Sequence, residues 1–314
     1  MDELEFDTPV FKQLAHNDTG EAEGHQGGIV IPKDLDPYFP QLSGKTSAAT
    51  PTISEQITGI LVVGGKEVAE VSTRYQFQTW GGARSPERRI TGALGPLRDK
   101  ASADDILLIE RNLTDRSLYR MTLVKKGTEK HKAVLRASSG KRWGVAEPLD
   151  PPVSEPEFEE AEKEQIEHEQ KPLVLMDNEA ATVETRSKRI ARGRAFQKLT
   201  ADYYDNKCAV CGLGFASLKA TEVEAAHIVP RSKKGADDAR NGIALCRSHH
   251  WAFDKGLWGV GPDGKIVISP GAAGKGSNHL LNDYAGKKPT PPSKAGKTPA
   301  PEAWAWHMAN LFGK

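Results

Sequence analysis

The sequence predicts an α+β protein with two domains, a β-rich N-terminal domain and a C-terminal domain that folds around a cluster of metal ligands. The chain has 314 residues, a length that suggests two domains with a linker between them. Strand-like runs of β-branched and aromatic residues fill much of the first half. All three cysteines lie between residues 208 and 246, in the second half.

The N-terminal domain is expected to span residues 28–146, after a polar and loosely ordered segment at residues 1–27. Gly64-Gly65 is a hairpin signal between the first two long strands. A short helical pattern covers residues 87–100, and residues 133–136 favour one more strand. The expected strands are residues 57–63, 67–80, 105–111 and 119–125.

One stretch of this domain, residues 73–91, interleaves arginine, glutamine and threonine with aromatic residues. Arginine and glutamine can read purine edges in a major groove, and arginine and threonine can hold phosphates. The alternative interpretation is a half-exposed strand with ordinary surface charge. The residues that we expect to contact DNA are Arg74, Gln76, Gln78, Arg84, Arg88 and Arg89.

Residues 147–185 are expected to be a linker, because prolines stiffen its start and residues 155–169 are strongly acidic. A short helix is the alternative for the acidic run. The charge then changes sign, and residues 186–199 favour a basic helix that can contact phosphates through Arg189, Arg192 and Arg194. A solvated amphipathic helix is the other interpretation of this stretch.

The second domain, residues 186–314, contains two pairs of metal ligands. Cys208 and Cys211 form a C-x-x-C pair, and Cys246 and His249 form a C-x-x-H pair. Four such ligands close a tetrahedral Zn²⁺ site and leave no position for water. The spacing therefore predicts a structural zinc ion that stabilises a segment with few large apolar residues.

Between the pairs, the sequence favours a strand at residues 222–229, a polar loop at 231–240, a return strand at 241–245 and a helix at 248–255. His227, Asn241 and His250 fall on these elements in that order. The arrangement resembles the ββα-metal fold of HNH endonucleases, and its Ala-Ala-His-Ile-x-Pro strand and His-x-x-Phe-Asp helix resemble restriction-type members. The resemblance covers residues 189 to about 269. A hairpin at 257–268 and a closing helix at 301–312 are expected to follow.

The resemblance implies a role for each residue of this centre. His227 would be the general base, Asn241 would orient the loop, and His250 would bind a catalytic Mg²⁺ or Mn²⁺ ion. Asp254, one turn after His250, is a second candidate ligand. Many HNH nucleases carry an acid or a histidine just before the base, but here that residue is Ala226, and Glu224 is the candidate to replace it. Without the surrounding HNH arrangement, a single histidine such as His227 would be interpreted as a buried core residue.

The N-terminal domain resembles, more distantly, the pseudobarrel recognition domain of the EcoRII restriction enzyme. That resemblance implies recognition of duplex DNA, and it rests on residues 74–91 and on the strand entry at 103–108.

Together these features predict an enzyme, an HNH endonuclease of the restriction type that cleaves double-stranded DNA at sites chosen by its N-terminal domain. The alternative is a DNA-binding protein that keeps the zinc and has a degenerate HNH centre. The net charge of +1 does not by itself indicate a nucleic-acid partner. A double-strand break needs two active centres, so a homodimer is expected. The chain shows no membrane-spanning run and no signal peptide, and its clustered cysteines fit a reducing compartment, so a cytoplasmic location is expected.

Overall fold

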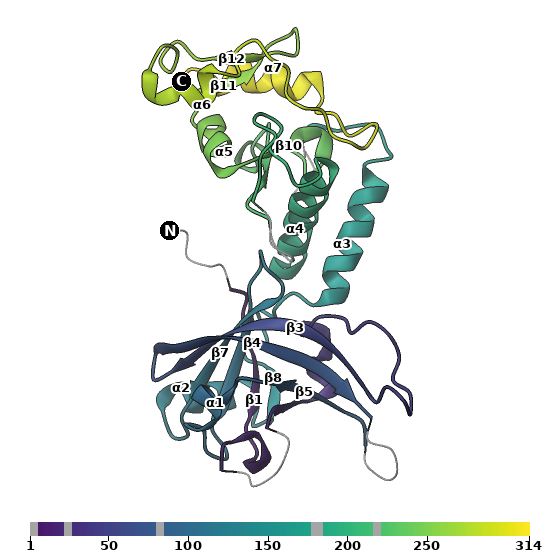
Figure 1. Cartoon of the computed structure of the whole chain (residues 1–314), viewed down its shortest axis with the longest axis vertical. Helices are drawn as coiled ribbons and strands as arrows, with labels where there is room; N and C mark the ends of the chain where they lie inside the picture. Colours follow the sequence, from purple (N-terminus) through teal and green to yellow (C-terminus); the bar gives the residue numbers. More distant parts are fainter. Residues whose placement is uncertain (1–5, 22–26, 80–84, 177–184, 216–220) are drawn as a thin grey trace. The chain divides into compact units, whose positions relative to one another are not determined.

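A computed structural model describes residues 6–21, 27–79, 85–176, 185–215 and 221–314. The chain forms two compact units, residues 1–157 and 158–314. The first unit is built on a large curled β-sheet, and the second combines helices with short strands (Figure 1). The predicted α+β class is therefore confirmed. No helix among the described residues is both long and apolar enough to cross a membrane.

The described part of the first unit contains one eight-stranded sheet, in the order β2-β5-β4-β3-β7-β6-β1-β8. The pairing of β3 with β7 is parallel and the other pairings are antiparallel. The strands are β1 (Val10–Gln13), β2 (Ile29–Ile31), β3 (Thr52–Val63), β4 (Lys66–Gln78), β5 (Glu87–Thr91), β6 (Ile106–Arg111), β7 (Leu118–Val124) and β8 (Trp143–Val145).

The longest hairpin, β3–β4, turns at the two glycines that the sequence indicated. Gly64 and Gly65 have φ angles of 60° and 76°. Both angles lie in the left-handed region, which a two-residue type I′ turn requires and which costs glycine little. The turn sets Val63 opposite Lys66, and a β-bulge between Leu61 and Val62 then shifts the register that continues to Thr52 opposite Gln78.

An aromatic stack forms the centre of the first unit. Phe39 stacks on Tyr75 with ring centroids 4.6 Å apart and on Tyr119 at 5.4 Å. The Tyr75 hydroxyl donates a hydrogen bond of 2.5 Å to Asp36, and the same carboxylate pairs with Arg88. Arg88, from the stretch expected to contact DNA, is thus linked through Asp36 to the aromatic stack.

Four sequence predictions in and after this unit differ from the structure. Part of the segment expected to be loosely ordered forms β1, because Val10 and Phe11 are buried between β6 and β8. Residues 87–100 form β5 and then the short helix α1 (Gly95–Arg98). Residues 133–136 belong to helix α2 (Glu129–Ala137), which Thr128 caps by accepting from the His131 amide. The acidic run forms helix α3 (Glu155–His168).

The second unit is organised around a two-stranded sheet of β9 (Glu224–His227) and β10 (Gly242–Leu245). Gln197 supports the free edge of β9: its amide group accepts from the Ala225 nitrogen and donates to the Ala225 oxygen. The other elements are α4 (Arg186–Tyr203), α5 (Arg247–Asp254), β11 (Trp258–Val260), β12 (Ile266–Ile268), α6 (His279–Asn282) and α7 (Pro301–Asn310). The predicted hairpin and closing helix are therefore present.

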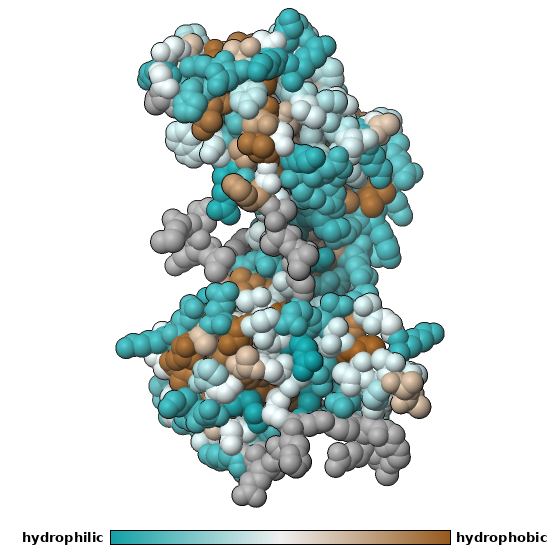
Figure 2. All heavy atoms as spheres, in the orientation of Figure 1, coloured by the Kyte–Doolittle hydropathy of each residue, from teal (hydrophilic) through white to brown (hydrophobic). Residues whose placement is uncertain are grey.

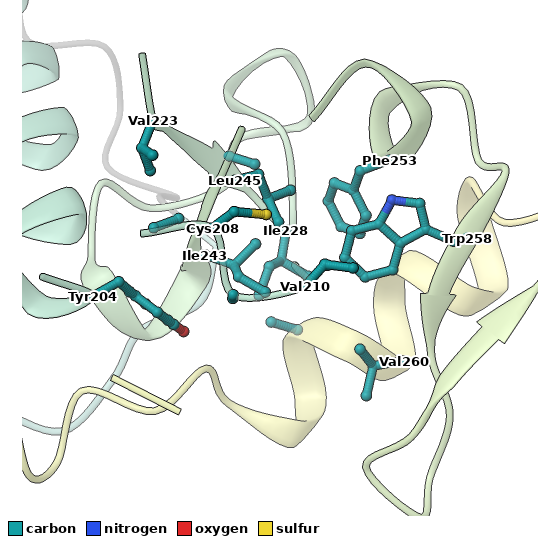
Figure 3. Packing of buried hydrophobic residues seen from close by; sticks show 14 of the residues in the cluster. Tyr204, Cys208, Val210, Val223, Ile228, Ile243, Leu245, Phe253, Trp258 and Val260 are labelled. Atoms are coloured by element: carbon teal, nitrogen blue, oxygen red, sulfur yellow. The ribbon is translucent and has the colours of Figure 1, made fainter. Parts of the chain in front are cut away.

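The core of this unit surrounds the first metal-ligand cysteine. Figure 3 shows the Cys208 sulfur among apolar side chains that include Ile228, just after β9, and Ile243 of β10, with Phe253 and Trp258 packed beside them. The metal-ligand cluster therefore borders directly on the core of the second unit. The molecular surface seen in Figure 2, by contrast, is mostly hydrophilic, with separate apolar patches.

His307 of α7 is a buried histidine in the same core. It is fully buried and stacks on Phe253, with ring centroids 4.0 Å apart and an angle of 6° between the planes. Burial lowers the pKa of His307 to about 4, and neither of its ring nitrogens has a hydrogen-bond partner among the described residues. The folded chain therefore holds this ring neutral over a pH range in which an exposed histidine is charged.

We expect the second unit to lose stability as the pH falls from 7 to 5, in part through His307. A histidine in the unfolded chain has a pKa of about 6.5, so below that pH the unfolded state binds a proton that the folded state does not. Stability from this residue is full above pH 6.5 and is lost as the pH falls toward 4, by roughly 2 kcal/mol between pH 7 and pH 5. His307→Phe keeps the ring stack and removes the titration. Denaturant unfolding of both proteins at the two pH values isolates this contribution, and equal pH dependence would contradict it.

Candidate active site and metal cluster

The four expected zinc ligands lie together. Donor atoms of Cys208, Cys211, Cys246 and His249 all lie within 4.8 Å of one another. His249 Nδ1 is 3.5 Å from the Cys208 sulfur and 3.1 Å from the Cys246 sulfur. A tetrahedral zinc ion, with bonds near 2.3 Å to sulfur and 2.0 Å to nitrogen, separates its ligands by about 3.5 Å. The cluster therefore fits a zinc ion.

The surroundings of the cluster also fit a closed metal site. His249 Nε2 lies 2.9 Å from the Leu280 carbonyl oxygen, so Nε2–H donates there and the Nδ1 lone pair faces the sulfurs. Burial raises the pKa of the Cys246 thiol to about 12, and the neighbouring Cys208 and Cys211 add to the rise. A cation would favour the thiolates instead.

His227, at the end of β9, is held by two neighbours. Its ring stacks on Phe196 of α4, with centroids 3.8 Å apart and an angle of 18° between the planes. Its Nε2 lies 2.8 Å from Oδ1 of Asp237. Gly242 permits this packing, because a Cβ there would lie 2.9 Å from the Phe196 ring. The side chain of His227 is 18% exposed, so this ring is fixed and still reachable.

Asp237, in the loop between the two strands, is a buried carboxylate surrounded by cations. It pairs with Arg192 at 2.9 Å and with Arg231 at 3.4 Å. Burial opposes ionisation, but the hydrogen bond from His227 and the charges of Arg231 and Arg192 outweigh it and lower the pKa of Asp237. Asp237 is therefore an anion at neutral pH.

Asn241 closes this loop on itself. Its side-chain oxygen accepts from the Val229 nitrogen at 2.9 Å, and its nitrogen donates to the oxygens of Val229 and Ala236. Gly235 allows the closure, because a Cβ at this position would lie 1.8 Å from the Val229 oxygen. Asn241 is fully buried, so it shapes the loop from within.

His250 of α5 lies between two carboxylates. Its Nδ1 is 2.7 Å from Glu224, and its Nε2 is 3.6 Å from Asp254. Burial lowers the pKa of His250, but the hydrogen bond with Glu224 and the charges of Asp254 and Glu224 outweigh it, so the net pKa is raised. The bond with His250 in turn lowers the pKa of Glu224. Glu224 and Ala226 share a face of β9, because side chains alternate along a strand.

The side chains expected to contact DNA are not brought together in the same way. Gln76 is buried, and its amide donates to Gln78 at 3.3 Å. Arg88 pairs with Asp36, and Arg89 pairs with Glu87 at 2.7 Å. Arg74, in contrast, is exposed. Arg84 lies outside the described residues.

The basic residues of α4 also differ in their exposure and contacts. Arg189 is exposed, Arg194 is half-buried, and Arg192 pairs with Asp237 beside His227. The contact between Arg192 and Asp237 could not be predicted from the sequence pattern. Asp237 was missed because it is one of two adjacent aspartates in a polar loop. Phe196, a buried residue of α4, supports His227 from the ring face.

The strand, loop, strand and helix that carry His227, Asn241 and His250 beside a Cys3His cluster define a nuclease domain. The family comparison identifies it: residues 208–261 match the family described as HNH endonuclease, and this segment of the chain is an HNH endonuclease domain. Among solved structures, the chain is similar to a "Modification dependent TagI restriction endonuclease" at 12% identity and a TM-score of 0.32, over 95% of this chain and 80% of that one. No curated protein matches the sequence.

Proposed function

We propose that this protein is a restriction-type DNA endonuclease that hydrolyses phosphodiester bonds with the help of a divalent cation. One observation carries the proposal: His227 is held on the HNH strand by Asp237 and Phe196 while its side chain stays 18% exposed. A neutral imidazole in such a place can accept a proton from water near pH 7. The water oxygen forms the new bond to phosphorus, the bond to the leaving sugar oxygen breaks, and that oxygen takes a proton from solvent.

The catalytic cation would bind His250 Nε2 and Asp254. Their separation of 3.6 Å needs little adjustment to reach the about 3 Å between neighbouring ligands of an octahedral Mg²⁺ with bonds near 2.1 Å. Glu224 contacts the other nitrogen of the ring, so it orients His250 as carboxylates commonly orient metal-binding histidines. A bound Mg²⁺ or Mn²⁺ would stabilise negative charge on the phosphate and on the leaving oxygen.

Incubation of plasmid DNA with the full chain tests this function. We expect nicked or linear DNA with Mg²⁺ or Mn²⁺ and intact plasmid in the presence of a chelator that leaves the zinc bound. The alternative, a DNA-binding protein with a degenerate centre, draws support from Ala226, which offers no ligand where many HNH nucleases have one. Binding without cleavage under every divalent ion would favour that alternative. Gel filtration with and without DNA would show whether the cutting species is the expected homodimer.

Site selection is assigned to the first unit, which carries the mixed arginine and glutamine stretch. We propose that Arg74, which is exposed, contacts DNA, and that Arg88, which pairs with Asp36, has a structural role. Among the α4 arginines, Arg189 is exposed, and we propose that it contacts phosphate. The structural contact of Arg192 makes it a weaker candidate for the same role.

We expect Arg74→Ala to change DNA binding and Arg88→Met to change stability. Arg88→Met removes the ion pair of Asp36, whose side chain is 35% exposed and keeps the Tyr75 hydrogen bond, so unfolding stability should fall by about 1 kcal/mol or less. Arg74→Ala should leave stability unchanged and weaken DNA binding. Denaturant unfolding and mobility-shift assays measure the two effects. Weaker DNA binding with normal stability in Arg88→Met would return Arg88 to the DNA-facing group.

A further inference from the structure

We propose that Asp237 is a positioning residue that fixes the tautomer of His227, so that Nδ1 is the nitrogen that accepts the proton. The inference rests on the proposed function of His227 as the general base. Its starting point is the 2.8 Å contact between His227 Nε2 and Asp237 Oδ1. An ionised carboxylate only accepts hydrogen bonds, so the hydrogen of the neutral imidazole must lie on Nε2. The lone pair is then on Nδ1.

The surroundings of Asp237 keep it ionised. Its side chain is only 7% exposed, and it faces Arg192 of α4 and Arg231 of the loop as well as His227. Two guanidinium groups and one imidazole therefore share one carboxylate. A protonated Asp237 would lose both ion pairs, so the acceptor state persists at neutral pH.

A second, independent constraint fixes the plane of the ring. Phe196 stacks on one face of His227 at 3.8 Å, while Asp237 sets the rotation of the ring within its plane. Among the described residues, the ring of His227 has no hydrogen-bond partner besides Asp237. Nδ1 is therefore the nitrogen that remains for a water molecule.

This arrangement also stabilises the product of proton transfer. When Nδ1 takes a proton from water, the imidazolium carries N–H groups on both nitrogens, and its charge faces Asp237. Loss of the carboxylate removes this stabilisation and lets the neutral ring adopt the other tautomer, because an asparagine amide can also donate to Nε2. Arg192 acts in this scheme through Asp237 and not as a phosphate contact.

Long-range ¹H–¹⁵N NMR of the full, zinc-loaded chain reads the tautomer without reference to cleavage. We expect Nε2–H for His227 in the wild type and a mixture of both neutral tautomers in Asp237→Asn. Cleavage by Asp237→Asn should fall by about 10²–10⁴-fold in kcat with little change in KM, because ground-state DNA binding is untouched. An Nδ1–H tautomer in the wild type would overturn the inference.

Asp238→Asn is the matched control. Asp238 is the adjacent aspartate and is fully buried, but it pairs with Arg240 at 2.6 Å and not with the histidine of β9. We expect this variant to lose stability and to keep the wild-type tautomer of His227. The same tautomer change in both variants would reduce Asp237 to a general structural role and overturn the inference. A wild-type protein with the Nε2–H tautomer that cuts no DNA would refute the proposed function alone.

Discussion

His227→Ala should lower DNA cleavage by about 10²–10⁴-fold while DNA binding and zinc content stay at wild-type levels. The histidine would act only in the chemical step, as the acceptor of the proton from water. It lies outside the Cys3His cluster, and Asp237 keeps its ion pairs with Arg192 and Arg231 in the variant, so the zinc site and the loop should persist. Plasmid cleavage, a mobility-shift assay and metal analysis on the same preparation measure the three quantities.

Asn241→Ala separates a chemical role from a structural one. Asn241 is fully buried and makes three hydrogen bonds that close the loop carrying Asp237. Its removal leaves buried backbone groups of Val229 and Ala236 unpaired, at a cost of about 1–3 kcal/mol for each group. We therefore expect this variant to lose stability and cleavage together. Cleavage near the wild-type rate in His227→Ala, at normal stability, would refute the assignment of the base.

The strand, loop, strand and helix of the HNH segment could be predicted because its signals are local. The spacing of the ligands identifies the two metal-binding pairs. Pro230 follows the first strand, and Gly242 begins the second. The partners of the histidines could not be predicted in the same way. Asp237 and Asp238 are equivalent in sequence, yet the first contacts His227 and the second contacts Arg240. Asp238 caps the one-turn helix at Ala239–Asn241, which leaves Asp237 to face β9, and this division is visible only in the folded loop.

The acidic segment shows how charge can conceal a pattern. Residues 155–169 were expected to be a linker because glutamates dominate the run. Its buried residues nevertheless fall at helical spacings, at Glu155, Phe158, Ala161, Gln165 and Glu169. The last of these pairs with Lys297 at 2.6 Å and accepts from the Tyr203 hydroxyl, both within the second unit. A glutamate at a buried helical position with a distant lysine partner leaves no signal in a single sequence.

His249→Ala and His250→Ala form a test of the two metal roles on adjacent residues of one helix. His249 Nδ1 faces the sulfurs of Cys208 and Cys246, whereas His250 contacts Glu224 and Asp254. We expect His249→Ala to lose the zinc and to unfold the second unit at moderate temperature. His250→Ala should keep the zinc and the fold and lose cleavage that depends on Mg²⁺ or Mn²⁺. Metal analysis, thermal unfolding and plasmid cleavage distinguish these outcomes.

The expected loss of stability in His249→Ala follows from the elements of the second unit that the metal cluster connects. Its ligands come from a turn before β9, from the end of β10 and from α5, and Cys208 is buried in the apolar core of the unit. Zinc bound in such a site contributes about 10–16 kcal/mol in small zinc domains, more than the total stability of many domains. Cys211→Ala removes a half-buried ligand from the same cluster and should act like His249→Ala. A folded protein without zinc in either variant would show that the core holds this unit together without the ion.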